Sequence, residues 1–270
     1  MCGIVGFSKD YILQNYENLD SKLNDYWNKL SHRGEDSYGI LTIYTENNKI
    51  KFHSLKSLSK EELLKDFKQK VLDKVDKENV LLMLCHNRKA SIGDVSLELA
   101  HPVVSENSII IHNGTKKAVV ELFSAYESDT QAFNELIEKF NKLNDKKLLK
   151  QLLSNAGVIF HFDLENLKII FHKSNRSLYY NEVGILSSEP VFTGEWYAIK
   201  KIGLKQLKLN KENIINLFSK LKKEDKKFYY IKQCRICDRF FYTENKRKQE
   251  CEKCHKNFNY YNYYNKIYKI

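Results

Sequence analysis

An uninterrupted apolar run, Val80 to Cys85, constrains the fold more than any other part of this 270-residue chain. A strand that does not alternate with polar residues is one that is covered on both faces. The predicted strands and helices also come in blocks and not in strict alternation, which argues against a doubly wound parallel sheet. The sequence therefore predicts an α+β fold in which this strand is buried on both sides.

Hydrophobic periodicity predicts the other elements. Apolar residues at helical spacing predict helices over 16–30, 59–75, 117–126, 129–143 and 146–153. Short apolar or alternating runs predict strands over 4–7, 40–44, 50–53, 108–111, 157–162, 168–172 and 184–186. Polar segments follow two of these strands directly, His86 to Ser91 and His112 to Thr115. Because functional residues often follow the elements of a rigid scaffold, we expect a site at these strand ends.

The chain begins Met1-Cys2-Gly3-Ile4-Val5-Gly6-Phe7. Removal of Met1, which a small second side chain permits, would give Cys2 both a thiol and an α-amine. The ordinary pKa of an α-amine is about 7.7–8.0, so near neutral pH the amine can serve as the base for its own sulfur. Cys2 is therefore a candidate nucleophile. The alternative is a buried cysteine that acts only as a small apolar residue.

Four of the six cysteines form two Cys-x-x-Cys pairs separated by thirteen residues: Cys234, Cys237, Cys251 and Cys254. This spacing is typical of a zinc ribbon, in which four thiolates bind one tetrahedral zinc. We therefore expect structural zinc here, with no open position for substrate. Phe240 to Tyr242 predicts a small strand between the pairs. His255 as a replacement ligand is the alternative to a solvated histidine, which we prefer.

The sequence contains no run of about 18 apolar residues, the length that a transmembrane helix needs. The first residues also lack the basic and apolar regions of a signal peptide. Paired cysteines in a chain without an export signal favour metal over disulfides. We therefore expect a cytoplasmic protein with no membrane partner.

The net charge of +11 is concentrated near the C-terminus. Residues 200–270 hold 20 Lys and Arg against 7 Asp and Glu, whereas residues 1–199 have a balance of −2. A basic segment favours nucleic acid or another acidic partner, although a compositional bias of the genome would give the same excess. Five tyrosines within 259–270 could stack on bases or pack against protein, and packing is the preferred interpretation.

Several motifs in this order resemble the glutaminase domain of class II glutamine amidotransferases over roughly residues 1–200. The start Met1 to Gly6 is similar to the start of that family, and four further segments match its motifs in sequence: 32–39, 86–92, 112–114 and 128–130. Ser187-Ser188-Glu189-Pro190 resembles a motif of the asparagine synthetase-like branch. The resemblance implies an N-terminal-nucleophile hydrolase, a four-layer αββα sandwich.

The resemblance also implies the roles of five residues. Cys2 would attack the side-chain amide of L-glutamine, and its own α-amine would move the proton. Asn113 and the backbone N–H of Gly114 would donate to the oxyanion. Arg88 would bind the substrate carboxylate and Asp129 its ammonium group.

Other motif residues are interpreted structurally. Arg33 and Asp36 are expected to pair with each other and order a loop, and Cys85 is expected to lie in the core. His86 and His112 are expected to pack or to form hydrogen bonds. His101 is expected near the site without a chemical role.

The sequence divides into four predicted parts: an amidotransferase domain at 1–205, a helical linker at 206–227, a zinc ribbon at 228–258 and a tail at 259–270. It contains no pyrophosphatase loop of a synthetase. We therefore expect a glutaminase that supplies ammonia to a separate synthetase, one that acts on a nucleotide or nucleic acid. The alternative is a zinc-ribbon protein that binds nucleic acid or a partner on an inactive amidotransferase scaffold.

Overall fold

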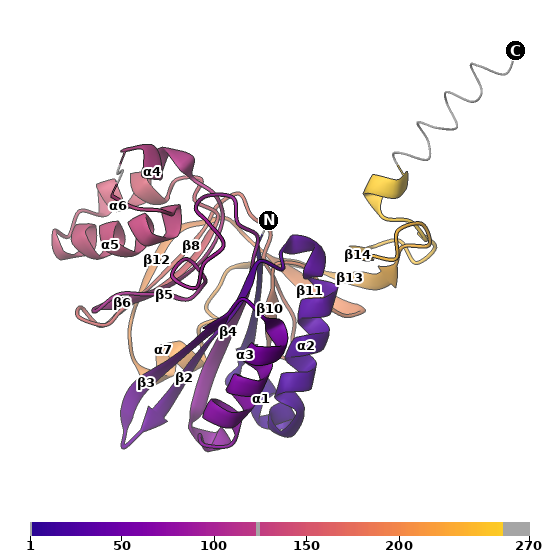
Figure 1. The fold of residues 1–270 in the computed structure, drawn as a ribbon, viewed down its shortest axis with the longest axis horizontal. Helices are drawn as coiled ribbons and strands as arrows, with labels where there is room; N and C mark the ends of the chain where they lie inside the picture. The colour runs from indigo at the N-terminus through magenta and orange to yellow at the C-terminus, as the bar shows by residue number, and fades with distance from the viewer. Residues whose placement is uncertain (1, 123–124, 256–270) are drawn as a thin grey trace, which may run out of the picture.

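The computed structural model describes residues 2–122 and 125–255, which form two antiparallel sheets and seven α-helices. The larger sheet has the strand order β14-β13-β11-β9-β10-β1-β4-β2-β3, and the smaller one β12-β8-β7-β6-β5 (Figure 1). The strands of the larger sheet are β1 (Gly3–Ser8), β2 (Ser37–Glu46), β3 (Lys49–Ser57), β4 (Val80–Arg88), β9 (Tyr179–Tyr180), β10 (Ile185–Ser187), β11 (Gly194–Ile199), β13 (Lys223–Gln233) and β14 (Phe240–Thr243). Those of the smaller sheet are β5 (Val103–Val104), β6 (Ser108–Asn113), β7 (Val158–Asp163), β8 (Lys168–Lys173) and β12 (Ile202–Lys208).

Helices cover the outer faces of both sheets (Figure 1). The larger sheet is covered by α1 (Lys9–Asn15), α2 (Leu19–Lys29) and α3 (Lys60–Phe67), and the smaller one by α4 (Lys117–Leu122), α5 (Asp129–Lys142) and α6 (Lys146–Leu153). Short 3-10 helices lie at Tyr16–Asn18, Ser31–Arg33 and Lys77–Asn79, and a π-helical turn, Lys68–Leu72, follows α3. None of the described helices is long and apolar enough to cross a bilayer.

The position of β4 explains why its sequence does not alternate between apolar and polar residues. All nine of its residues are buried. Met83 and Cys85 belong to the core beneath α1–α3, whereas Leu82 and Leu84 belong to the core between the two sheets. Successive side chains of a strand point to opposite faces, so a strand between two cores needs apolar residues at every position. The predictions of a doubly covered strand and of a core position for Cys85 are confirmed.

The segment 206–227 differs from the helical linker that we expected. It contains the end of β12, the helix α7 (Lys211–Ile215) and the beginning of β13. Ile214, Leu217 and Phe218 are buried in the core between the sheets, because their helical spacing places apolar side chains on one face. The Lys-rich start of β13 carries no apolar alternation and was not recognisable as a strand.

The strand β13 links the larger sheet to the cysteine-containing ribbon. Its first half pairs with β11 of the central sheet, and its last four residues pair with β14, the small strand that we expected between the cysteine pairs. Tyr242 of β14 packs on Tyr229 of β13 and Tyr179 of β9, with ring centroids 5.7 and 5.8 Å away. The predicted division points at 205 and 227 both fall inside strands, and the predicted tail lies outside the described residues.

Candidate active site and cysteine cluster

Cys2 lies directly before β1, which runs between β4 and β10 in the middle of the larger sheet. Its side chain is buried, and its Sγ lies 3.4 Å from the backbone N of Lys89. Gly3 lets the two strands approach closely there, because a Cβ at this position would lie 2.1 Å from Asn87 Oδ1. Burial raises the pKa of the Cys2 thiol, so the sulfur needs a base to become a thiolate near neutral pH.

One cavity brings together four of the five residues expected at the site. Cys2, Arg88, Gly114 and Asp129 line it, although they come from distant parts of the chain. Its other lining residues are Lys89, Ser91, Ile92, Leu99, His101, His112, Ser128 and Thr130. The cavity measures only about 20 Å³, room for about one water molecule. Asn113 does not line it.

Arg88 ends β4 with its side chain buried. The guanidinium donates to two backbone carbonyls of the following segment, 2.8 Å to Asp94 O and 3.0 Å to Ile92 O. The same N–H groups could form a bidentate contact with a carboxylate. Arg88 thus holds the 89–99 segment over the cavity through the donors that a carboxylate would use.

Asp129 is the first residue of α5, where the helix dipole stabilises a negative charge. The Ser128 hydroxyl caps this helix by accepting from Gln131 N. Asp129 is buried; its Oδ2 accepts from Lys116 N at 2.7 Å, and its Oδ1 lies 3.9 Å from His112 Nδ1. The carboxylate therefore sits at the cavity with one oxygen not used by the backbone.

Asn113 ends β6 beside the cavity and is engaged by Ser188. Its Nδ2 donates to Ser188 Oγ at 3.0 Å, and the same hydroxyl accepts from Ile4 N at 2.9 Å. Only glycine fits at the next position, because a Cβ on Gly114 would lie 2.0 Å from Ala156 O. Ser188 thus ties the Asn113 amide to the strand that begins after Cys2.

We expected Arg33 and Asp36 to pair with each other, but the structure gives each of them other partners. Arg33 Nε donates to Cys2 O at 2.8 Å, and its Nη1 pairs with Glu189. Asp36 instead accepts from Ala90 N at 2.8 Å. The loop that carries both residues therefore fixes the backbone of Cys2 on one side and the segment after Arg88 on the other. The sequence could not show this, because these partners lie in distant segments of the chain that flank separate strands.

Three buried histidines form a network at the cavity, and two of them, His101 and His112, line it. The His86 and His101 rings lie 4.0 Å apart between centroids, and His86 Nε2 lies 3.1 Å from the His112 carbonyl oxygen. Thr130 Oγ1 lies 3.1 Å from His101 Nε2 and 3.0 Å from His112 Nδ1. Burial lowers the pKa of His86 to about 3, so this ring stays neutral. Packing and hydrogen bonding account for His86 and His112, as expected.

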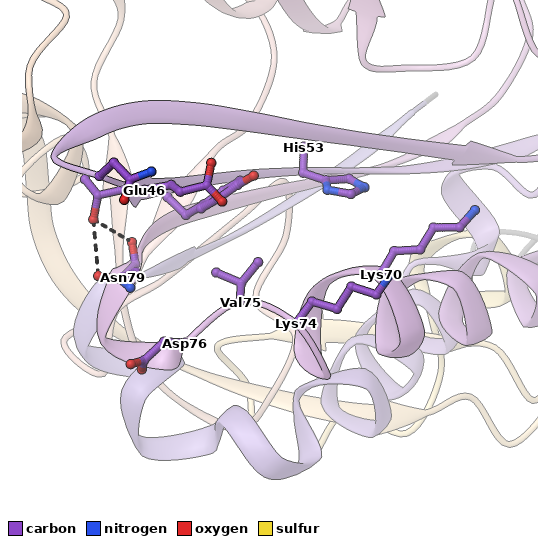
Figure 2. A pocket seen from close by; sticks show the side chains of 10 residues that line it. Glu46, His53, Lys70, Lys74, Val75, Asp76 and Asn79 are labelled. Carbon is purple, nitrogen blue, oxygen red and sulfur yellow. Dashed lines mark hydrogen bonds between the residues drawn. The ribbon is translucent and has the colours of Figure 1, made fainter.

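A larger cavity of about 620 Å³ lies away from these residues, between the β2–β3 hairpin and the segment after α3 (Figure 2). His53 extends into it from the hairpin, and Lys70 and Lys74 come from the opposite side (Figure 2). Lys70 pairs with Asp66 at 2.6 Å. None of the residues expected at the active site lines this cavity, so size does not identify the site.

The four C-terminal cysteines converge at one point. Their sulfur atoms all lie within 4.8 Å of one another, and Cys237 Sγ lies 3.8 Å from Cys251 Sγ. Zn–S bonds of about 2.3 Å place the sulfurs of a tetrahedral site about 3.8 Å apart, so the cluster fits such an ion. His255 is outside the cluster, with its Nδ1 3.4 Å from Glu250 Oε2. The four-cysteine cluster can bind a metal ion.

Comparisons with known proteins agree with the motifs. No family model matches the chain. A glutamine–fructose-6-phosphate aminotransferase (isomerizing) of Buchnera aphidicola is 26% identical over 244 residues, 82% of this chain and 37% of the relative. Proteins of the same name from Staphylococcus epidermidis and Staphylococcus aureus are 30% and 28% identical over 152 and 192 residues, 53% and 66% of this chain and 23% and 30% of those relatives.

The match thus spans only about a quarter to a third of the length of these curated relatives. The chain carries the ordered motifs at Cys2, Arg88, Asn113 and Asp129, whose side chains the fold brings to one region. Its similarity to these aminotransferases agrees with the resemblance of those motifs to class II glutamine amidotransferases.

Proposed function

We propose that this protein hydrolyses L-glutamine to glutamate and ammonia, with Cys2 as the nucleophile. The observation that carries the proposal is the shared cavity of Cys2, Arg88, Gly114 and Asp129. Its relatives are named as aminotransferases that use glutamine, which supports the same substrate here. The four layers of helices and sheets support an N-terminal-nucleophile hydrolase fold.

The chemistry follows from the geometry of an amide and a thiol. After loss of Met1, the α-amine of Cys2 takes the thiol proton, and the sulfur bonds to the amide carbon. Donors at Asn113 and Gly114 stabilise the negative oxygen that develops. The C–N bond then breaks as the proton passes to the leaving nitrogen, which departs as ammonia. Water cleaves the resulting thioester, releasing glutamate and restoring the thiol.

Arg88 and Asp129 would bind the two charged groups at the amino-acid end of glutamine. A guanidinium for the carboxylate and a carboxylate for the ammonium select a free amino acid over a glutamine within a peptide. Both residues are buried, which strengthens charge-assisted contacts relative to water.

Glutamine requires more space than the cavity of about 20 Å³ provides. The segment 89–99 covers the cavity, and Arg88 holds it through Ile92 O and Asp94 O. A substrate carboxylate competes for these same donors, so binding has to be accompanied by release of the segment. The Asn113 Nδ2 group likewise has to give up its hydrogen bond to Ser188 Oγ before it can donate to the oxyanion.

The ammonia would pass to a separate synthetase in the cytoplasm, as the resemblance to a glutaminase domain suggests. A nucleotide or nucleic acid is the acceptor class that the basic C-terminal region favours. The four-cysteine cluster would bind zinc through Cys234, Cys237, Cys251 and Cys254. Such an ion supplies folding free energy to the ribbon, and its closed thiolate coordination leaves no position for substrate.

The test uses the full chain with Met1 removed, as verified by mass spectrometry, and measures glutamate release from glutamine. Cys2→Ala is expected to abolish release, and the protein that retains Met1 is the matched control, with the same thiol but no adjacent amine. Addition of cell extract, which would supply the partner enzyme, tests whether a partner in trans activates glutamine hydrolysis. Full activity of Cys2→Ala, or no turnover in any of these mixtures, would contradict the proposal.

A further inference from the structure

Another cavity shares the lining residue Lys89 with the cavity of Cys2. It measures about 300 Å³, which is at the lower end of the range for ligand pockets. Ser31, His32, Gly34, Glu35 and Asp36 line it from the loop before β2, Lys89 from the segment after β4, and Arg239 from the turn between β13 and β14. Residues of the ribbon and residues next to strands of the larger sheet therefore line this cavity together.

Most charges around the cavity are already compensated. Asp36 accepts from Ala90 N at 2.8 Å and lies 3.3 Å from Lys89 Nζ. His32 Nε2 lies 3.0 Å from Glu189 Oε2. Among the described residues, neither Glu35 nor Arg239 has an ion-pair or side-chain hydrogen-bond partner, and the two do not pair with each other.

We propose that this cavity binds a free α-amino acid, with its carboxylate at Arg239 and its ammonium group at Glu35. A guanidinium can form a bidentate contact with a carboxylate, and a carboxylate is the natural acceptor for an ammonium group. The lining residues carry equal numbers of Lys or Arg and of Asp or Glu, so a molecule with both charges fits better than a dianion such as phosphate.

The position of the cavity separates this amino acid from the glutamine that is hydrolysed. Lys89 lines both cavities, and its backbone contacts Cys2 Sγ, so the two ligands would lie near the same residue. Gly34 of this cavity also packs on the backbone of Arg88, which lines the Cys2 cavity, because a Cβ at Gly34 would lie 2.4 Å from the Arg88 carbonyl carbon. The bound amino acid is therefore placed next to the point where ammonia would be released.

The experiment measures binding to the full chain by ligand-observed NMR, with L-alanine, L-aspartate and L-lysine as probes. Acetate and methylammonium, each carrying one of the two charges, are the comparison ligands. At least one amino acid is expected to bind at millimolar Kd, at least tenfold more tightly than acetate or methylammonium. Arg239→Gln and Glu35→Gln are each expected to weaken it at least tenfold. Both side chains are exposed, so neither variant threatens the core.

Arg247→Gln is the matched control, because it removes an exposed arginine of the same ribbon that does not line the cavity. Asp129→Asn is the second control and is expected to leave the binding unchanged. Binding that Asp129→Asn abolishes and Arg239→Gln does not alter would assign it to the glutamine cavity and overturn the proposal. Equal binding of acetate, or no amino acid bound at 20 mM, would overturn it as well. Because no readout depends on Cys2, failure here leaves glutamine hydrolysis untouched.

Discussion

At the scale of single residues, the candidate site depends on groups that hold other groups in place. Ser188 joins Asn113 to Ile4 N, and Arg33 joins the Cys2 carbonyl to Glu189. Each of these side chains is buried at the junction of separate strands. The proposed nucleophile and oxyanion donors are therefore positioned by contacts that no local sequence pattern records.

Asp129→Asn tests the binding of the substrate ammonium group. The amide keeps the size of the carboxylate but loses its charge, and a hydrogen bond to a charged group contributes about 1.5–3 kcal/mol. We expect KM for glutamine to rise about 10- to 150-fold, with a smaller change in kcat. Initial-rate kinetics measure both. Glu127→Gln, at an exposed position two residues earlier, is the control, and an equal effect there would exclude a specific role.

Ser188→Ala tests the hydroxyl that accepts from Ile4 N and Asn113 Nδ2. Its removal leaves a buried N–H without a partner, which costs about 1–3 kcal/mol. We expect a matching loss in the free energy of unfolding, measured by urea denaturation, and a lower kcat because Asn113 loses its orientation. Ser105→Ala is the control, since Ser105 bonds only to Ser108 near the distant end of β6. Unchanged stability in Ser188→Ala would contradict this role.

At the scale of elements, the histidines lie where strands and helices meet. His86 on β4, His101 before β5 and His161 on β7 are buried, and burial lowers the pKa of all three. The lowered values reach about 3 for His86 and about 4 for His161. Elements that pack through neutral imidazoles make the fold sensitive to acid.

Stability is therefore expected to fall between pH 7 and pH 5. Below about pH 6.5 the unfolded chain binds protons at these histidines and the folded protein does not, so the unfolded state is favoured as the pH drops. Each buried histidine contributes on the order of 1–2 kcal/mol to the loss at pH 5. Urea midpoints across this range measure the effect. His101→Asn should flatten the dependence, and a flat profile in the unaltered protein would contradict it.

The cysteine cluster gives a prediction for the β13–β14 hairpin. Chelation of zinc is expected to increase amide hydrogen exchange over 230–243, because closed metal sites supply much of the folding free energy of small ribbons. Amides of β1 and β4 should stay protected, since their hydrogen bonds belong to the centre of the larger sheet. Cys237→Ser is expected to show the same exchange pattern without chelator. Equal exchange with and without metal would argue against a structural ion.

At the scale of the whole molecule, the sequence predicts those features that depend on local pattern. The absence of alternation in Val80–Cys85 predicts a doubly covered strand, and helix α3 begins where Ser59 caps it by accepting from Glu62 N. The order of the motifs predicts that Cys2, Arg88, Gly114 and Asp129 belong together, which their shared cavity supports. Cys85 is a core residue for the same reason that its strand is apolar.

Other features depend on contacts between distant segments, and the sequence does not contain them in readable form. The Lys-rich start of β13 has no strand pattern, because five successive residues, 224–228, are exposed and the pairing with β11 decides their conformation. The partners of Arg33 and Asp36 lie in distant segments that flank other strands, so the prediction that these two residues pair with each other was wrong. The placement of the 89–99 segment at the cavity likewise depends on the hydrogen bonds from Arg88 to Ile92 O and Asp94 O, which no sequence pattern records.

The double membership of β13 has a consequence for dividing this protein into fragments. A cut after residue 227 would break that strand in its middle, leaving β11 without half of its hydrogen-bonding neighbour and Tyr179 without its aromatic cover. Unpaired sheet edges recruit strands from other molecules, so the larger fragment should self-associate more than the intact chain. The β13–β14 hairpin thus also protects one edge of the larger sheet.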